Sequence, residues 1–298
     1  MIRFSVVIPA YNYGGLIERS VLSVCSQAND KTEIIVVDDG STDSTPEVLA
    51  RLSRDEPRLV VRRQENAGPS AARNFGVQQA SGSYILFLDA DDELLPGALT
   101  EFSCALDSEP DAEVVVASTL SEFSDGREKR SPAPEVSDIP EQRFLDYLYK
   151  RLRLSNGAVL MARSLLLRFP FNPVLRQTED IPVFAHCLVA GRCAALDKPV
   201  VRIHKHDGSR RHGSEAALSV GMQLVEEVFD AERLPATLMV HRDRYRARRA
   251  LSLFRSLYRA RRFAEARYFF RVALLADWRQ ALSRPGNLLK YLRTVNKR

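Results

Sequence analysis

Three aspartates directly follow an apolar segment, in the run Asp89-Ala90-Asp91-Asp92. Carboxylates this close repel one another unless a cation or a set of hydrogen-bond donors neutralises them. Oxygen ligands suit Mg²⁺ or Mn²⁺, which commonly take one or two carboxylates together with the phosphates of a substrate. The run therefore predicts a divalent metal beside a phosphate-containing ligand. The alternative is that these carboxylates only cap the helix that begins near Pro96.

Two other polar runs follow or adjoin strand-like segments. Asp38-Asp39-Gly40-Ser41 has the composition of a turn, and turn formation alone would explain it. If this run shares a sheet edge with the three aspartates, one of its carboxylates is placed to accept hydrogen bonds from a nucleotide base or a ribose. Arg73 follows the turn residues Asn66 and Gly68, a little over one turn into a predicted helix. It could contact phosphate oxygens or pair with a surface carboxylate, and both interpretations stay open.

Asp180 stands at the start of an apolar helical segment, in Gln177-Thr178-Glu179-Asp180. There it either caps the helix or acts as a general base that removes the proton of an acceptor hydroxyl. A further polar run, 202–209, contains His204 and His206 and predicts a turn. A histidine in such a turn is more often a surface residue than a metal ligand.

These residues need a scaffold, and the hydrophobic pattern predicts one. Strand-like segments at 4–8, 33–38, 58–62, 84–88 and 112–117 alternate with segments of helical periodicity. The strands are apolar on both faces, which is typical of a Rossmann-like α/β fold, a mostly parallel sheet flanked by helices. Ligands of such sheets bind beyond the carboxyl ends of the strands, where the polar runs after residues 8, 37 and 88 would converge. The polar stretch 120–140 predicts a surface loop.

The composition is that of an ordinary globular protein, but the charge is unevenly distributed. Of the 298 residues, 45% are apolar and 27% are charged. Residues 241–298 contain 17 Lys and Arg against 3 Asp and Glu, whereas residues 1–240 contain 26 against 35. Apolar stripes on 251–257 and 263–274 predict a helical hairpin in the basic part. We therefore expect an α/β domain that carries the ligand site over 1–214 and a basic helical region over 215–298.

Four motifs together resemble the family 2 glycosyltransferases, a large group of inverting enzymes with the GT-A fold. The matching segments are Phe4-Ser-Val-Val-Ile-Pro-Ala-Tyr-Asn12, Glu33 through Ser44, Asn66 through Gly76, and Gly82 through Asp92. Their order, spacing and strand context agree with the family. The middle of the chain agrees more loosely, through Glu179-Asp180 and the run 206–209, and the C-terminal region carries no resemblance.

The resemblance implies a nucleotide-sugar donor and a role for each matched residue. The positions that would bind the donor are Pro9, Ala10, Tyr11, Asp39, Gly68, Arg73, Asp89, Ala90 and Asp91. Among them, Pro9, Ala10 and Tyr11 would line the nucleotide pocket, and Asp39 would accept a hydrogen bond from the base, commonly uracil.

The same resemblance implies the metal ligands and the catalytic base. Asp89-Ala90-Asp91 matches the family's Asp-x-Asp motif, so Asp91, with Asp89 nearer the ribose, would hold Mn²⁺ or Mg²⁺. Asp92 and His206 are secondary candidates for the metal. Asp180 matches the family's proposed base, which favours catalysis over capping at that position.

The residues and the resemblance predict a metal-dependent inverting glycosyltransferase. It would move one sugar from a nucleoside diphosphate sugar to a carbohydrate or lipid-linked hydroxyl, in the synthesis of a cell-surface polysaccharide or glycolipid. The Gln-x-x-Arg-Trp motif of processive members is absent, because the only tryptophan is Trp278 in the tail. Two alternatives are a nucleotidyltransferase, whose loop after the first strand usually carries a lysine that 9–14 lacks, and an inactive protein that docks at membranes.

The basic tail, 241–298, has three interpretations. Arginine-rich amphipathic helices bind anionic lipid surfaces, which would bring the protein to the inner face of the cell membrane. A solvated charged helix face is the second interpretation, and nucleic acid is not expected as a partner because no nucleic-acid motif accompanies the charge. Neither a transmembrane segment nor a signal peptide is predicted, so we expect a cytoplasmic protein.

Overall fold

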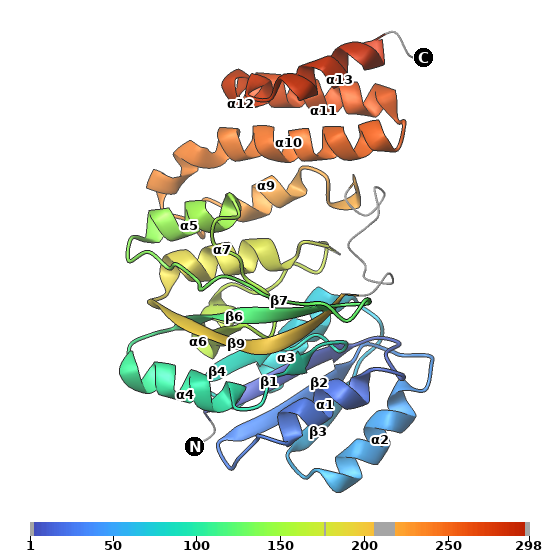
Figure 1. Cartoon of the computed structure of the whole chain (residues 1–298), viewed down its shortest axis with the longest axis vertical. Helices are drawn as coiled ribbons and strands as arrows, with labels where there is room; N and C mark the ends of the chain where they lie inside the picture. Colours follow the sequence, from blue (N-terminus) through green and yellow to red (C-terminus); the bar gives the residue numbers. More distant parts are fainter. Residues whose placement is uncertain (1–2, 176, 206–217, 296–298) are drawn as a thin grey trace. The chain divides into compact units, whose positions relative to one another are not determined.

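The computed structural model describes residues 3–175, 177–205 and 218–295 (Figure 1). The chain divides into two compact units. The first comprises Met1–Val174 and Val183–Ser209, and the second comprises Leu175–Pro182 and Arg210–Arg298. Each unit has a hydrophobic core of its own.

The first unit is a sheet with helices on both faces, as the alternating pattern predicts. In chain order its elements are β1 (Phe4–Ala10), α1 (Ile17–Cys25), β2 (Thr32–Asp38), α2 (Thr45–Asp55), β3 (Leu59–Arg63), α3 (Pro69–Gln79), β4 (Tyr84–Phe87), β5 (Glu93–Leu94), α4 (Ala98–Ser108), β6 (Val114–Phe123), β7 (Glu128–Arg130), α5 (Pro140–Leu148), β8 (Val159–Ala162), α6 (Arg163–Arg168) and β9 (Cys193–Lys205). Between α6 and β9, α7 (Asp180–Ala190) begins in the second unit and continues in the first.

The strands form one sheet in the order β3-β2-β1-β4-β8-β6-β9-β5, and β7 pairs with β6. β3, β2, β1 and β4 are parallel, so their carboxyl ends meet at one edge. β8 is antiparallel to both β4 and β6, whereas β6 and β9 are parallel. The sheet is thus parallel in the half that carries the predicted site residues and mixed in the other half.

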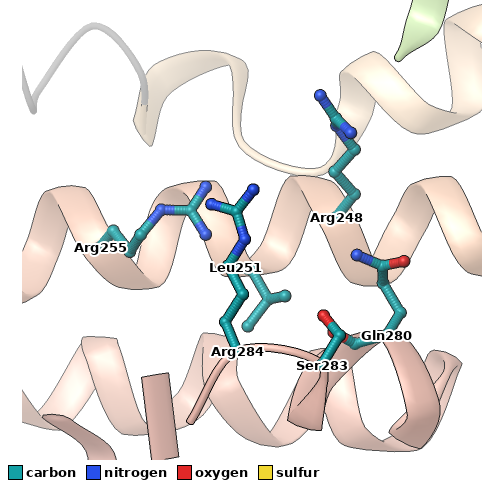
Figure 2. Close-up of a pocket in the computed structure, with 6 residues that line it drawn as sticks. All are labelled: Arg248, Leu251, Arg255, Gln280, Ser283 and Arg284. Atoms are coloured by element: carbon teal, nitrogen blue, oxygen red, sulfur yellow. The ribbon is translucent and has the colours of Figure 1, made fainter. Parts of the chain in front are cut away.

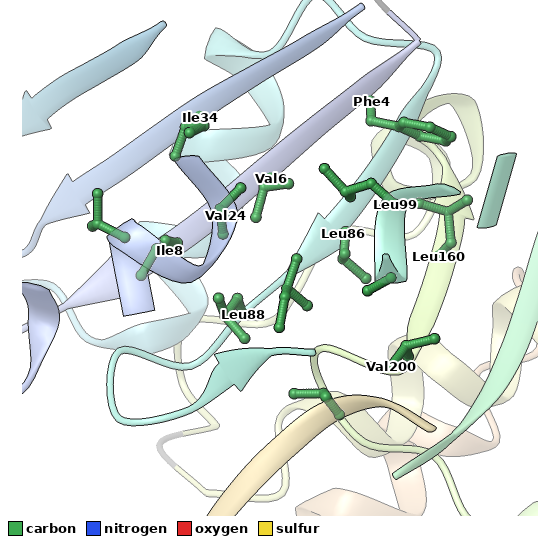
Figure 3. Close-up of a cluster of buried hydrophobic side chains, with 14 of the residues drawn as sticks. Phe4, Val6, Ile8, Val24, Ile34, Leu86, Leu88, Leu99, Leu160 and Val200 are labelled. Carbon is green, nitrogen blue, oxygen red and sulfur yellow. The ribbon is translucent and has the colours of Figure 1, made fainter. Parts of the chain in front are cut away.

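Both faces of the sheet are buried, which explains why its strands are apolar throughout. Val6 and Ile8 of β1 pack in a cluster with side chains of α1, α2 and α4 (Figure 3). The intervening Val7 packs in a second cluster with side chains of α3, α6 and α7. Because successive side chains of a strand point to opposite faces, one run of β-branched residues serves both clusters.

Two segments differ from the sequence prediction. The stretch 120–140 is not a loop throughout, because β6 continues to Phe123 and pairs with β7 from Leu120↔Arg130 to Glu122↔Glu128. The run after Val201 is not a turn at its start, because β9 continues to Lys205. β7 is exposed and most of β9 is only half-buried, so both strands tolerate polar side chains and lack a continuous apolar pattern in the sequence.

Glu33 on β2 joins three segments at the amino end of the sheet. Its Oε1 accepts hydrogen bonds from Ser5 Oγ of β1 at 2.5 Å, from Ser81 N at 2.6 Å and from Gly82 N at 3.1 Å. Burial alone would raise the pKa of Glu33, but these hydrogen bonds outweigh it and hold the pKa below the ordinary value of 4.5. The folded protein therefore favours the charged carboxylate.

We expect Glu33→Gln to lower the free energy of unfolding by about 1 kcal/mol at neutral pH, because an amide oxygen accepts weaker hydrogen bonds than a carboxylate. The folded pKa is the lower one, so the contribution is present above the unfolded pKa and is lost as pH falls through the folded pKa. Urea unfolding should show that the difference in free energy of unfolding between wild type and variant becomes smaller from neutral to acidic pH. Glu109→Gln, at an exposed position, is the control; a difference of equal size at both ends of the pH range would contradict the assignment.

The second unit is helical in the part after residue 217. Its elements are α9 (Gln223–Val228), the 3₁₀ helix η1 (Ala236–His241), α10 (Arg242–Arg259), α11 (Phe263–Ala276), α12 (Trp278–Leu282) and α13 (Pro285–Val295). The predicted helical hairpin is confirmed: α10 and α11 pack through Ala250, Leu257, Ala266 and Ala273, all fully buried. None of the helices in the described parts of the chain combines the length and the apolar character that a bilayer crossing needs.

Candidate functional site

The turn after β2 is shaped by Asp38, which is buried. Its Oδ1 accepts a hydrogen bond from Ser41 N at 2.8 Å, and its Oδ2 pairs with Arg63 Nη1 of β3 at 2.9 Å. Gly40 has a φ of 75°, a left-handed conformation that glycine adopts without a steric penalty. The turn function of the run therefore rests on Asp38 and Gly40.

Asp39, the neighbouring aspartate, fixes the segment 64–68 that precedes α3. Its Oδ1 accepts hydrogen bonds from Gln64 Nε2 at 2.7 Å and Ala67 N at 2.9 Å, and its Oδ2 accepts one from Gly68 N at 2.8 Å. The carboxylate is buried, and Gly68, with a φ of 91°, starts α3 beside it. A carboxylate has about four acceptor positions, so these three hydrogen bonds leave room for one more donor. Contact with a base at that position stays a prediction.

Asp39→Asn is expected to lower the free energy of unfolding by about 1 kcal/mol, because an amide nitrogen facing Ala67 N or Gly68 N cannot accept that hydrogen bond. Urea denaturation measures the change. The matched control is Asp111→Asn, whose carboxylate is exposed and pairs with Arg192 at the surface. Wild-type stability in Asp39→Asn would show that the carboxylate does not hold the segment.

The end of β1 is joined to the turn after β2. Ala10 O accepts a hydrogen bond from Asp39 N at 2.8 Å, and Asn12 N donates one to Ser41 Oγ at 2.9 Å. Pro9 and Tyr11 are half-buried, and Ala10 is buried. Asn12 has a φ of 59° and accepts a hydrogen bond from Thr42 N at 2.8 Å. The two strand exits therefore meet, as the parallel pairing predicts.

Asp89, at the end of β4, is held by donors from two directions. Arg73 Nη2 of α3 and Asn156 Nδ2, from the segment before β8, each donate to Asp89 Oδ1 at 3.0 Å. Arg73 is buried, and its guanidinium carbon lies 5.5 Å from the centre of the Phe171 ring. The sequence left open whether Arg73 contacts phosphate or pairs with a carboxylate. In the structure it pairs with a carboxylate, that of Asp89. Asn156 carried no signal in the sequence beyond its place before a strand.

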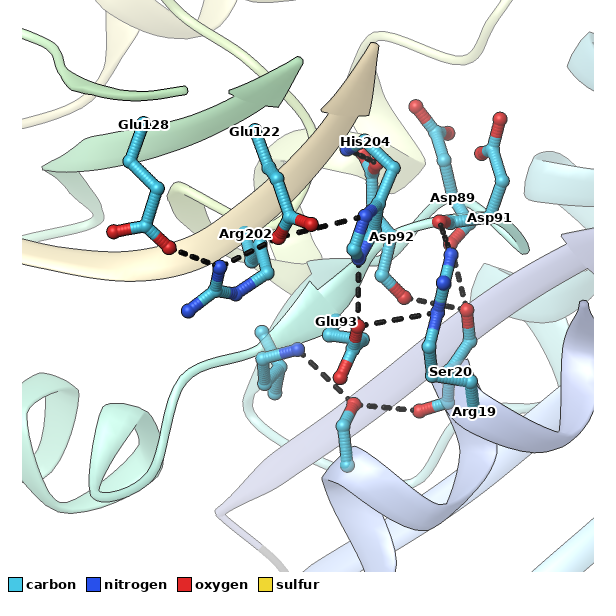
Figure 4. A network of polar contacts seen from close by, with 12 residues as sticks. Arg19, Ser20, Asp89, Asp91, Asp92, Glu93, Glu122, Glu128, Arg202 and His204 are labelled. Carbon is cyan, nitrogen blue, oxygen red and sulfur yellow. Dashed lines mark hydrogen bonds and ion pairs between the residues drawn. The ribbon is translucent and has the colours of Figure 1, made fainter. Parts of the chain in front are cut away.

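The aspartate run forms a turn that α1 supports from below (Figure 4). Asp92 N donates to Asp89 O at 3.0 Å, which closes the turn around Ala90 and Asp91. Arg19 Nη2 of α1 donates to Asp91 O at 2.7 Å, and Ser20 Oγ donates to the carbonyl oxygens of Asp89 and Asp92. The backbone of the turn is therefore fixed by α1, independently of its carboxylates.

The carboxylate of Asp92 faces the sheet. Its Oδ1 accepts a hydrogen bond from His204 N of β9 at 3.0 Å, and the side chain is buried. Burial, followed by the charges of Asp89 and Asp91, raises the pKa of Asp92 to about 8. Asp92 therefore ties the turn to β9, and its role as a metal ligand stays a prediction.

A second set of polar contacts adjoins the aspartate turn and was not predicted. His204 Nε2 lies 2.6 Å from Glu93 Oε1, which also pairs with Arg19 Nε at 3.1 Å (Figure 4). Arg202 Nη1 pairs with Glu122 at 2.6 Å and contacts Glu128 of β7. These residues are far apart in the sequence. The pairing of β5 with β9 brings Glu93 to His204, and the pairings of β6 with β9 and with β7 bring Glu122 and Glu128 to Arg202.

Asp89 and Asp91 are the carboxylates that could hold a divalent cation. Within the ranges that the structure describes, no group of three His, Cys, Asp or Glu side chains is arranged to hold a metal ion, and His206 lies outside those ranges. The described hydrogen bonds to the Asp89 carboxylate go to Oδ1, and Figure 4 shows the Asp89 and Asp91 carboxylates pointing to the same side. Two carboxylates plus phosphate oxygens are a usual set for Mg²⁺ or Mn²⁺. The residues fit a cation that is shared with a ligand.

Asp180 is the first residue of α7 and belongs to the second unit. Thr178 before it has a φ of 58°, and Thr178 O accepts a hydrogen bond from Ile181 N at 3.1 Å. The predicted helix therefore begins where the sequence indicates. The role of Asp180 as a general base and its role as a helix cap both stay predictions.

Comparison with known proteins gives one family and a partial match to curated relatives. The model of the family "Glycosyl transferase family 2" matches residues 5–197. The Campylobacter jejuni GalNAc(5)-diNAcBac-PP-undecaprenol beta-1,3-glucosyltransferase is 41% identical over 102 residues, which are 34% of this chain and 33% of that protein. The chain spans about half the length, or less, of the curated relatives it matches.

Solved structures resemble the chain over nearly its whole length. S. aureus TarS 1–349 in complex with UDP-GlcNAc gives a TM-score of 0.67 at 22% identity and covers 98% of this chain and 90% of that one. The mannosyltransferase PcManGT from Pyrobaculum calidifontis, in complex with GDP-Man and Mn²⁺, gives 0.57 at 19% identity, over 98% and 84%. At these identities the likeness concerns the fold, and it confirms the expected GT-A fold. Since the family model also covers more than half of the sequence, the chain belongs to glycosyl transferase family 2.

Proposed function

We propose that the protein transfers a single sugar from a UDP-sugar to a hydroxyl of a carbohydrate or lipid-linked acceptor, with inversion at the anomeric carbon. The observation that carries this proposal is the aspartate turn after β4. There Arg73 and Asn156 hold Asp89, at the same edge of the sheet at which β2 ends just before Asp39. A nucleotide needs an acceptor for its base and a cation for its phosphates; in this proposal Asp39 is the acceptor, and Asp89 and Asp91 hold the cation. Two solved structures of the same fold were determined with UDP-GlcNAc and with GDP-Man.

The donor would lie against the strand exits. Pro9, Ala10 and Tyr11 form the wall of the nucleotide pocket in this proposal. Asp39 and Gly68 lie beside the nucleotide base. Asp91 and Asp89 would hold Mn²⁺ or Mg²⁺, which when bound stabilises the negative charge of a departing diphosphate. Arg73 and Asn156 would position Asp89 for the cation, because their hydrogen bonds already orient its carboxylate without a ligand.

Asp180 is the proposed general base. Its carboxylate would accept the proton of the acceptor hydroxyl while the hydroxyl oxygen forms its bond to the anomeric carbon. The bond from that carbon to the diphosphate oxygen breaks at the same time. Attack opposite the leaving group inverts the configuration, so no covalent sugar intermediate forms.

The acceptor and the location are proposals of the same kind. The Campylobacter jejuni relative is named for an undecaprenol-linked substrate, which supports a lipid-linked acceptor in the synthesis of a cell-surface polysaccharide or glycolipid. In the basic helical unit, Leu275 is 89% exposed and Trp278 is 61% exposed, and Leu289 and Leu292 of α13 are also exposed. Exposed apolar side chains among arginines suit the surface of an anionic membrane. We therefore propose peripheral contact through 241–298 at the inner face of the cell membrane.

A thermal-shift panel tests the donor site. UDP, GDP, dTDP and CMP are each added with Mn²⁺ or with EDTA, because a ligand that binds only the folded state raises the melting temperature. We expect UDP with Mn²⁺ to give the largest rise. A rise with a different nucleotide would replace UDP and keep the donor site, whereas no rise with any nucleotide would contradict the proposed site.

A further inference from the structure

A small cavity lies within the second unit, against α10, α12 and the link from α12 to α13 (Figure 2). We call it the arginine pocket. Its volume is about 100 Å³, and the described residues that line it are Arg248, Leu251, Arg255, Gln280, Ser283 and Arg284. Three of these residues are arginines, and none of them is acidic. A bound water needs roughly 10–15 Å³ of such accessible space, so the pocket has room for several waters or one compact anion.

Two of the arginines lie close together without a carboxylate in the lining. Figure 2 shows Arg284 reaching from the α12–α13 link across Leu251, with its guanidinium group beside that of Arg255. Burial lowers the pKa of Arg255, and the charges of Arg284, Arg248 and Arg259 lower it further. Like charges on a partly buried surface destabilise one another, and the balance of 17 basic to 3 acidic residues in 241–298 adds to this. A bound anion would relieve the repulsion.

We propose that the arginine pocket binds a phosphate group. Guanidinium groups match a phosphate in geometry, because each presents parallel N–H donors to two of its oxygens. The Gln280 side chain, which also lines the pocket, carries two more N–H donors, and the buried Leu251 forms an apolar floor. The phosphate group could belong to a soluble phosphate compound or to a lipid headgroup, and the chemistry of recognition is the same.

The arginine pocket shares no residue with the proposed site of sugar transfer. All six lining residues belong to the second unit, and none of them is among the predicted donor, metal or catalytic residues. Its test uses no nucleotide and no divalent cation, so its failure would leave the donor-site proposal unaffected.

The first arm of the test uses soluble anions. The full chain is titrated with inorganic phosphate and with pyrophosphate in EDTA, at an ionic strength kept constant with KCl, and the melting temperature is followed. We expect a rise in wild type, and an affinity lower by at least about tenfold in Arg284→Gln and Arg255→Gln, because each loses charged hydrogen bonds. Arg293→Gln on α13 is the matched control: it removes the same charge from an exposed position and should bind like wild type.

The second arm distinguishes the source of the phosphate. Co-sedimentation compares phosphatidylcholine vesicles that contain either phosphatidic acid or phosphatidylserine at equal anionic content. A preference for phosphatidic acid that Arg284→Gln loses and Arg293→Gln keeps would assign the pocket to a lipid phosphate. Binding of soluble phosphate without that preference would assign it to a soluble compound.

Two outcomes would overturn the proposal. In the first outcome, wild type and Arg284→Gln show the same melting shift with phosphate and the same binding to both kinds of vesicle. The phosphate would then bind elsewhere on the protein. The other is no shift with either anion and no preference between the vesicles. Arg284 is exposed, so its variant should fold even if replacement of the half-buried Arg255 prevents folding.

Discussion

Asp180→Asn is expected to lower the rate of sugar transfer by roughly a hundred- to ten-thousand-fold while nucleotide binding stays at the wild-type level. This is the range that general base catalysis contributes, and a carboxamide cannot accept the proton of the acceptor hydroxyl. The sugar donor is chosen as the one whose nucleotide gives the largest melting shift. The rate is then measured as the release of that nucleotide in the presence of a lipid-linked acceptor. Binding is measured by the same melting shift with Mn²⁺.

The choice of asparagine separates the base from the helix cap. Asparagine caps a helix about as well as aspartate, so Asp180→Asn should keep the wild-type stability if α7 is capped there. Glu179→Gln, at the preceding position, is the control for loss of a negative charge and should keep most of the activity. Near-normal turnover in Asp180→Asn would remove the residue from the mechanism and leave only the cap.

Asp91→Ala is expected to abolish the Mn²⁺-dependent part of nucleotide binding. With Asp91 gone, Asp89 is the one carboxylate of the pair that remains, and its Oδ1 already accepts hydrogen bonds from Arg73 and Asn156. The variant therefore loses one of the two carboxylate ligands and half of the negative charge that attracts the cation, so the cation should no longer link the diphosphate to the protein. The readout is the melting shift with nucleotide, compared between Mn²⁺ and EDTA.

The control for Asp91→Ala is Asp111→Ala, which removes an exposed carboxylate elsewhere in the same unit. It should keep the wild-type response to Mn²⁺. Because α1 fixes the backbone of the turn through Arg19 and Ser20, loss of the Asp91 carboxylate should not unfold it. Equal Mn²⁺-dependent stabilisation in wild type and Asp91→Ala would contradict the metal assignment.

The parallel half of the fold could be predicted because its signals are local. Val6, Val7 and Ile8 are apolar in sequence, and both faces of β1 are buried in the structure. The position of Asp89 after β4 follows from the same pattern, since a polar run after a buried strand must lie at the sheet edge. The helical hairpin was predictable from its apolar stripes for the same reason.

The other half was harder because its strands depend on distant partners. β9 contains Asp197-Lys198-Pro199, a run that argues against a strand, and its pairing with β6 shifts register beside it. Asn156 reaches Asp89 only because β8 lies next to β4 in the sheet. No spacing in the sequence reports such a contact, so Asn156 could not be identified in advance, whereas Arg73 was a candidate because of its place in a motif.

The hydrogen bonds to Asp89 have a consequence for the thermodynamics of binding. A free aspartate side chain loses rotational freedom when it is recruited by a ligand, and that loss weakens the affinity. Here Arg73 and Asn156 restrict the side chain as soon as the protein folds. The entropy is therefore lost in folding and not in association, so a ligand that contacts the remaining oxygen meets a pre-organised group.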